Sequence, residues 1–314
     1  MRPGAGETEY LVAGCHGKLP FWPEYLDVNV ALPASRAFRT WIRDGRAAAG
    51  MGRDSQDGKV PPETSRHRFI YAPNGSSDLL AGVIRPSSDI GGKREFPFSV
   101  FVHVGRRHWS GKSYSLLPIA LEPVWDALDD VWESLATATS EPAFREIINA
   151  ARVPTPRPAG VAKASYDAGQ DLAAAQVFDG ASGASVEALR ANFPDMLRAL
   201  KHNPADVRLE LPTSSDQDAA SFDAAFWVEL VNHQFFWKRF EPSVFLEGAP
   251  RRTERKVFLL FADPAASDYS RIMGMSDQPG VFQRPAHARD GAVASPSPGS
   301  APTYAELAAT RFVA

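Results

Sequence analysis

Two apolar runs in the middle of the chain, at 79–84 and 98–104, constrain the fold more than any other feature. The loop between them is polar and contains the adjacent glycines Gly91 and Gly92. In the second run, apolar side chains occupy both alternating sets of positions, so a strand there would be buried on both faces. Such a strand is typical of the centre of a sheet that helices cover. The stretch from Leu79 to Val104 therefore predicts two strands at the middle of the fold.

The remaining segments predict further strands and amphipathic helices around this centre. Strands are expected at 10–13, 66–72, 207–212, 226–231, 235–240, 243–246 and 256–262. Helices are expected at 32–45, 121–135, 140–148, 185–202 and 214–225, with a short one from Pro264. Residues 14–25, which are rich in glycine and proline, are expected to form a turning loop. These elements predict an α/β fold with a mixed, largely antiparallel sheet and helices packed on it.

The distribution of proline and glycine suggests how the chain is divided. Three prolines lie between 153 and 159, and an Ala-, Gly- and Asp-rich stretch follows. We therefore expect one domain over residues 10–275, with an insertion or subdomain around 151–220. Residues 276–314 are rich in Pro, Ser and Ala and predict a disordered tail.

Composition excludes several classes of protein. The 314 residues carry a formal net charge of -3, which gives no reason to expect nucleic acid as a partner. Cys15 is the single cysteine and cannot form an intramolecular disulfide. No apolar run approaches the roughly 18 residues that a membrane helix needs, and the N-terminus has no apolar signal region. We expect a cytoplasmic protein without membrane insertion.

The sequence contains no convincing catalytic pattern. The seven histidines are scattered, without the spacing of metal ligands. Cys15 and His16 are adjacent, but a catalytic dyad needs side chains that converge in space. The loop from Ser87 to Asp89 has the composition of an active-site loop, although a turn between strands uses the same residues. We predict no catalytic, cofactor-binding or metal-binding residues.

The segment Gly105–Ser113 offers an alternative, a nucleotide-binding enzyme. Gly111-Lys112-Ser113 follows a predicted strand and precedes a helix, which is the context of a phosphate-binding loop. However, five residues separate Gly105 from Gly111 where four are needed, and Pro118 predicts that the regular helix begins too late. We keep this interpretation as the alternative to a binding protein.

Four arginines lie on the outer faces of the helix predicted at 32–45. They are Arg36, Arg39, Arg43 and Arg46. They indicate either a solvated helix face or a basic patch for an acidic partner, and we favour the solvated face.

Two motifs in order give the chain a family resemblance. The first is Gly17-Lys18-Leu19-Pro20, followed by Leu32-Pro33 before a helix that contains Trp41. The second is the loop from Pro86 to Asp89, followed by Gly92 and Phe96-Pro97. Together they resemble the type VI secretion system-associated family known as TagF or ImpM, over residues 10 to about 150. The sequence Pro23-Glu24-Tyr25 stands where the family has Gly-Asp-Phe, and it keeps the acid and the aromatic residue.

The resemblance implies a function and a set of structural or partner-binding residues. It implies a non-enzymatic cytoplasmic regulator that represses type VI secretion after translation by binding a forkhead-associated scaffold protein. An accessory subunit that assists assembly is a further hypothesis. The motif residues are Gly17, Lys18, Leu19, Pro20, Glu24, Tyr25, Trp41, Pro86, Ser87, Asp89, Gly92, Phe96 and Pro97.

Overall fold

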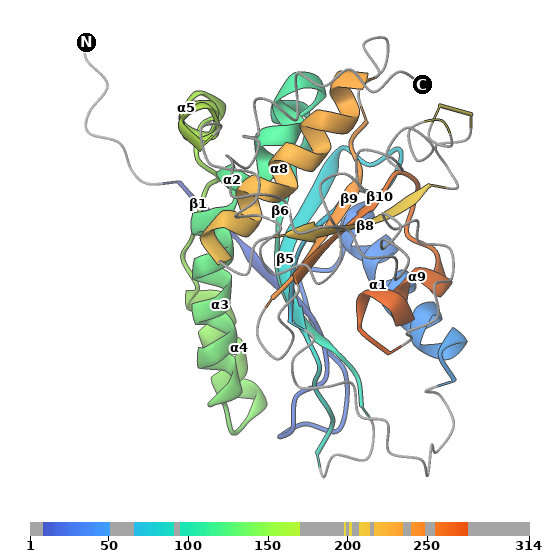
Figure 1. Cartoon of the computed structure of the whole chain (residues 1–314). Coiled ribbons are helices and arrows are strands. Elements are labelled where there is room, and N and C mark those ends of the chain that lie inside the picture. The colour runs from blue at the N-terminus through green and yellow to red at the C-terminus, as the bar shows by residue number, and fades with distance from the viewer. Residues whose placement is uncertain are drawn as a thin grey trace, which may run out of the picture.

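An eight-stranded antiparallel sheet between two groups of helices forms the centre of the molecule in the computed structural model (Figure 1). The structure describes residues 9–50, 66–90, 95–169, 198, 201–202, 207–213, 217–234, 240–248 and 255–275. The strands are β2 (Ala13–Gly17), β3 (Leu26–Val28), β4 (His67–Tyr71), β5 (Asp78–Arg85), β6 (Phe98–Gly105), β8 (Arg208–Thr213), β9 (Ser243–Glu247) and β10 (Arg255–Leu260). Their order in the sheet is β3-β2-β6-β5-β4-β9-β10-β8. A separate pair joins β1 (Tyr10–Leu11) to β7 (Val153–Pro154).

The two strands predicted at the centre, β5 and β6, lie in the interior of this order. They pair from Asp78 opposite Gly105 to Arg85 opposite Phe98, and nearly every residue of both strands is buried. The α/β class with helices on a largely antiparallel sheet is confirmed, and every pairing among the described strands is antiparallel.

Helices cover both faces of the sheet, which explains why its central strands are apolar on both sides. One face carries α2 (Leu117–Ala120), α3 (Glu122–Ala136), α4 (Glu141–Ala150), α5 (Ala159–Gly169) and α8 (Gln217–Gln234) (Figure 1). The other carries α1 (Pro33–Ala48) and α9 (Ala266–Ile272). Each group of helices closes its own hydrophobic core against the sheet. The alternating side chains of the strands therefore enter two different cores.

The helix predicted to end at Gly45 continues to Ala48, so that boundary was wrong. Gly45 is buried and faces α9, where a Cβ atom would lie 2.3 Å from Cβ of Tyr269. The glycine therefore serves the close approach of two helices rather than a helix end.

The predicted strand at 226–231 was also wrong. These residues belong to α8, which is continuous with the helix expected at 214–225. Phe226, Trp227, Val228, Leu230 and Val231 are all buried, so this part of the helix is covered on most of its sides. A helix that is apolar all round has no amphipathic period, and a short run of aromatic and branched residues then looks like a strand.

The turning loop expected at 14–25 was wrong at its first residues, because Ala13–Gly17 forms β2. Strands at 66–72, 207–212, 243–246 and 256–262 and helices at 121–135 and 140–148 are confirmed within a few residues. The tail 276–314 and most of the segments at 185–202 and 235–240 lie outside the described residues. The proposed domain boundaries stay a prediction.

Candidate functional site

The two family motifs meet in space through a buried ion pair. Lys18 follows β2 directly, and Asp89 lies in the loop after β5. The Lys18 Nζ atom is 3.7 Å from Asp89 Oδ2, and the two side chains are only 3% and 8% exposed. Nζ also donates a hydrogen bond of 2.7 Å to the carbonyl oxygen of Pro23. Because both charges are withdrawn from water, their attraction is stronger than at the surface, so the pair helps to hold the two loops together.

Gly17 allows a third motif segment, Phe96-Pro97, to pack closely against the end of β2. Its φ is +142°, and a Cβ atom there would lie 2.2 Å from the carbonyl oxygen of Pro97. Only glycine fits such a backbone at such a distance. Phe96, next to Pro97, donates its backbone N–H to the carbonyl of Ser87 over 2.9 Å. The end of β2, the loop after β5 and the approach to β6 therefore form one unit.

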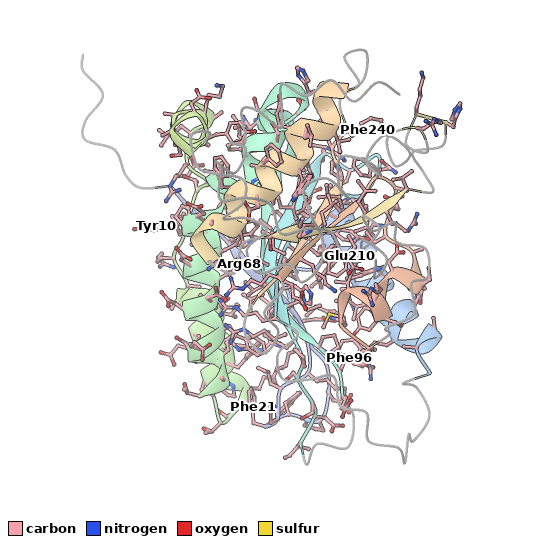
Figure 2. The ribbon with its side chains drawn as sticks, viewed as in Figure 1. Tyr10, Phe21, Arg68, Phe96, Glu210 and Phe240 are labelled. Atoms are coloured by element: carbon pink, nitrogen blue, oxygen red, sulfur yellow. The ribbon has the colours of Figure 1, made fainter. Side chains whose placement is uncertain are left out.

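A pocket of about 360 Å³ lies beside this unit, between β3 and α1. Its lining includes His16, Tyr25, Asp27, Arg39, Arg43 and Phe96. Phe96 lies on the α1 side of the sheet, as Figure 2 shows. The Tyr25 and Phe96 rings meet edge to face, with centroids 4.7 Å apart. The imidazole of His16 lies 5.4 Å from Phe96 and 6.1 Å from Tyr25, so three rings form one wall of the pocket.

Three side chains of the pocket lining, those of His16, Asp27 and Arg39, contact one another in series. The antiparallel register of β2 and β3 sets His16 opposite Asp27. The His16 Nδ1 atom is 2.6 Å from Asp27 Oδ1, and Arg39 of α1 lies 2.8 Å from the other oxygen, Oδ2. Since a carboxylate only accepts, Nδ1 carries the proton of the imidazole. The second ring nitrogen, Nε2, is buried and has no hydrogen-bond partner within the described residues.

The lining of the pocket is positively charged. Arg36, Arg39 and Arg43 all line it, against the single carboxylate of Asp27, which leaves a formal charge of +2 with His16 neutral. Arg36 and Arg43 are exposed, and Arg43 pairs only with its exposed neighbour Asp44 among the described residues. The solvated helix face that we favoured from the sequence is thus also one wall of a pocket.

Other motif residues lie outside this pocket. Leu19 is buried in the core on the opposite face of the sheet, and Trp41 lies on the buried side of α1, where its Nε1 donates to the Ala265 carbonyl over 3.0 Å. Pro20 and Glu24 are exposed, and Pro86 is half-buried. Gly92 lies outside the described residues. Leu19 and Trp41 therefore contribute to packing, while Tyr25 and Phe96 belong to the pocket.

Sequence reasoning missed His16 and Asp27 as site residues. Their pairing depends on the register of β2 and β3, and the segment was expected to be a loop. The arginines did leave a signal, because positions 36, 39 and 43 are three and four residues apart and share one helix face. That spacing alone does not distinguish a pocket wall from a solvated surface.

The structure does not favour the nucleotide-binding alternative at Gly105–Ser113. Two short 3-10 helices, Arg106–His108 and Gly111–Leu116, form this segment, and the regular helix begins only at Leu117. The backbone N–H of Gly111 donates to the Glu241 carboxylate over 3.1 Å, and Arg106 pairs with the same carboxylate. The Glu241 carboxylate thus occupies two of the donors that this segment would offer to a phosphate.

Cys15 and His16 do not form a dyad. They alternate on β2, so Cys15 enters the core on the α3 side while His16 faces the pocket. Burial raises the pKa of the Cys15 thiol far above its usual range, so the reactive thiolate is suppressed. Within the described ranges there is no group of three or more His, Cys, Asp or Glu side chains placed to hold a metal ion. No helix in the same ranges is both long enough and apolar enough to span a membrane.

The protein is of the α/β class, with a pocket of positively charged lining beside the two motifs. Residues 14–151 match the family model of the TagF N-terminal domain, type VI secretion system-associated, so this part of the chain is a TagF N-terminal domain. The protein is therefore type VI secretion system-associated. Among solved structures, the crystal structure of PA0076 from Pseudomonas aeruginosa PAO1 is similar at 20% identity, with a TM-score of 0.34. The match covers 46% of this chain and 65% of that one. No curated protein matches the chain.

Proposed function

We propose that the protein is a non-enzymatic cytoplasmic regulator that represses assembly of the type VI secretion system by binding a forkhead-associated scaffold protein. The observation that carries this proposal is the match of residues 14–151 to the TagF N-terminal domain. The family to which that domain belongs implies both the repressor role and the scaffold partner.

The geometry of the motif residues supports recognition of another protein. The buried Lys18–Asp89 pair holds two loops in a fixed arrangement beside the pocket. Tyr25 is 49% exposed at its rim, and Arg36 and Arg43 are exposed along α1. Tyrosine and arginine are enriched where protein interfaces bury their central contacts. The pocket and its rim are thus the surface we assign to the partner.

A pull-down from the protein's own cells tests the proposal. Tagged full-length protein is expected to capture the forkhead-associated scaffold, identified by mass spectrometry. A double variant that carries both Arg36→Glu and Arg43→Glu should lose the scaffold, because it reverses the charge of one pocket wall. The control Arg107→Glu reverses the charge of one exposed arginine outside the pocket and should retain the scaffold.

A deletion strain tests the direction of regulation. Secretion through the apparatus is expected to rise when the gene is removed and to return to its original level when the gene is restored. A fall in secretion would instead indicate the accessory subunit. Unchanged secretion, without capture of any component of the apparatus, would contradict the regulatory function altogether.

A further inference from the structure

We propose that the pocket between β3 and α1 binds a phosphomonoester, presented as a phosphorylated side chain of a protein segment. The inference rests on the proposed function, because it assigns the chemistry that the partner-binding surface recognises. Its test uses purified protein and small probes, so it can fail while the proposed function holds.

The charge of the lining selects the ligand class. The lining residues include three arginines and one carboxylate, a formal charge of +2, and Asp44 at the edge pairs with Arg43. A phosphomonoester carries a charge of about -1.5 to -2 near neutral pH and would match this lining. A side-chain carboxylate, with a single negative charge, would leave a cation unmatched. Complementary charge of this kind favours phosphate over carboxylate.

The three arginines come from one helix face. Arg36, Arg39 and Arg43 lie three and four residues apart on α1, and all three line the pocket. Asp27 engages Arg39 at 2.8 Å, while Arg36 has no ion pair within the described part of the chain. Guanidinium groups bind phosphate oxygens through two parallel N–H donors, and such clusters recognise phosphorylated side chains in other folds.

A buried histidine supplies an independent indication of a ligand. His16 lines the pocket, is only 5% exposed, and its Nε2 has no hydrogen-bond partner among the described residues. Its Nδ1 is held by Asp27 at 2.6 Å, which fixes the ring orientation. A buried polar atom without a partner is costly unless a ligand satisfies it. With the ring proton on Nδ1, Nε2 is an acceptor, so it can take a hydrogen bond from the P–OH group of a singly ionised phosphomonoester.

The dimensions and the aromatic wall fit a side chain rather than a free ion. The volume of about 360 Å³ exceeds what a phosphate alone would fill and lies in the range of ligand pockets. Tyr25 and Phe96 provide apolar surface beside the arginines. The stem of a phosphorylated residue would pack on these rings while its phosphate reaches α1.

Calorimetric titration of the full chain tests this inference. The probes are N-acetyl amides of phosphoserine, phosphothreonine and phosphotyrosine, with N-acetylglutamate amide and inorganic phosphate for comparison. At least one phosphorylated probe should bind saturably, more tightly than the glutamate and inorganic phosphate probes, and its affinity should fall as salt rises. Arg36→Ala and Arg43→Ala should each weaken it by about tenfold or more.

Matched variants make the outcome specific to the pocket. Both arginines are exposed, so these variants should keep their fold, which is checked by thermal unfolding. Arg107→Ala removes the same charge at an exposed site elsewhere and should leave the affinity unchanged.

Several results would overturn the inference. They are no saturable binding of any phosphorylated probe, equal binding of the glutamate probe, or equal weakening by Arg107→Ala. If probes fail to bind while the scaffold is still captured by the wild type, the phosphate inference alone is wrong. If probes bind but no component of the apparatus is captured and secretion does not change, the proposed function alone is wrong.

Discussion

Two groups of three arginines lie on opposite faces of the sheet, and they differ in how their charges are compensated. On the α3 face, Arg66, Arg68 and Arg85 approach three carboxylates, those of Asp126, Asp129 and Glu133. On the α1 face, Arg39 pairs with Asp27, Arg43 pairs with the exposed Asp44, and Arg36 has no ion pair within the described residues. Figure 2 shows Arg68 on the side of α3 and Phe96, in the pocket wall, on the side of α1. The arginines are thus matched in the first group and exceed their carboxylate partners in the second.

Burial explains why the α3 group is fully matched. The Arg68 side chain is 7% exposed and lies 2.6 Å from Asp126 Oδ1 and 3.0 Å from Asp129 Oδ2. Burial, with Arg85 and Arg68 nearby, lowers the pKa of Arg66 to about 10, so it is still charged at neutral pH. Charges withdrawn from water in this way need partners inside the protein. Exposed arginines on α1 need none for folding, so their excess charge is available to a ligand.

Removal of the central carboxylate on the α3 face should have the largest effect on stability. Asp129→Asn leaves three arginines with one shared negative charge fewer, at a buried position. We expect the free energy of unfolding to fall by about 3–5 kcal/mol, measured by urea denaturation. The adjacent Asp130 is exposed, and Asp130→Asn should change it by less than about 0.5 kcal/mol. Equal effects of the two variants would show that the matched cluster does not stabilise the fold.

The backbone beside the pocket should be the next most sensitive point, for a reason unrelated to charge. Gly17→Ala places a Cβ atom 2.2 Å from the Pro97 carbonyl oxygen at a φ of +142°. Strain and displacement of the β6 approach should cost about 2–3 kcal/mol in urea unfolding. Gly160→Ala has open space and should be neutral or slightly stabilising. A stable Gly17→Ala protein with unchanged ligand binding would contradict the role of this close contact.

Asp27 is the carboxylate in the pocket lining, so replacing it changes how far the charges of the pocket arginines are compensated. Asp27→Asn removes the charge that holds both His16 and Arg39, and should lower the free energy of unfolding by about 1–2 kcal/mol. It also raises the formal charge of the lining to +3, so affinity for a phosphorylated probe should increase. Titration calorimetry measures that increase.

The control for Asp27 lies on the same side of the molecule. Asp44 is exposed and pairs with Arg43 alone within the described residues, so Asp44→Asn should leave stability unchanged. Weaker probe binding by Asp27→Asn, in a protein shown to be folded, would mean that orientation of Arg39 matters more than the charge of the lining.

The sequence could predict the centre of the sheet but not the partners of either arginine group. The strands β5 and β6 were found because helices cover both faces, which leaves an apolar pattern in the residues themselves. Arg68 and Asp129 lie 61 positions apart, and no local pattern connects them. His16 and Asp27 meet only through strand register, and β2 was concealed by the glycines that its neighbours require. Local periodicity reports burial, whereas charge pairing is decided by tertiary contacts.

The smallest effect on stability, and the sharpest test of the comparison, is expected at the exposed arginines of the pocket. Arg36→Ala and Arg43→Ala should shift the melting temperature by less than about 2 °C, because neither side chain is buried. Arg68→Ala, which removes a buried partner from Asp126 and Asp129, should lower it by many degrees. If the α1 variants were as destabilising as Arg68→Ala, their charges would be needed for folding. The excess on the α1 face would then not be available to a ligand, and the distinction between the two faces would fail.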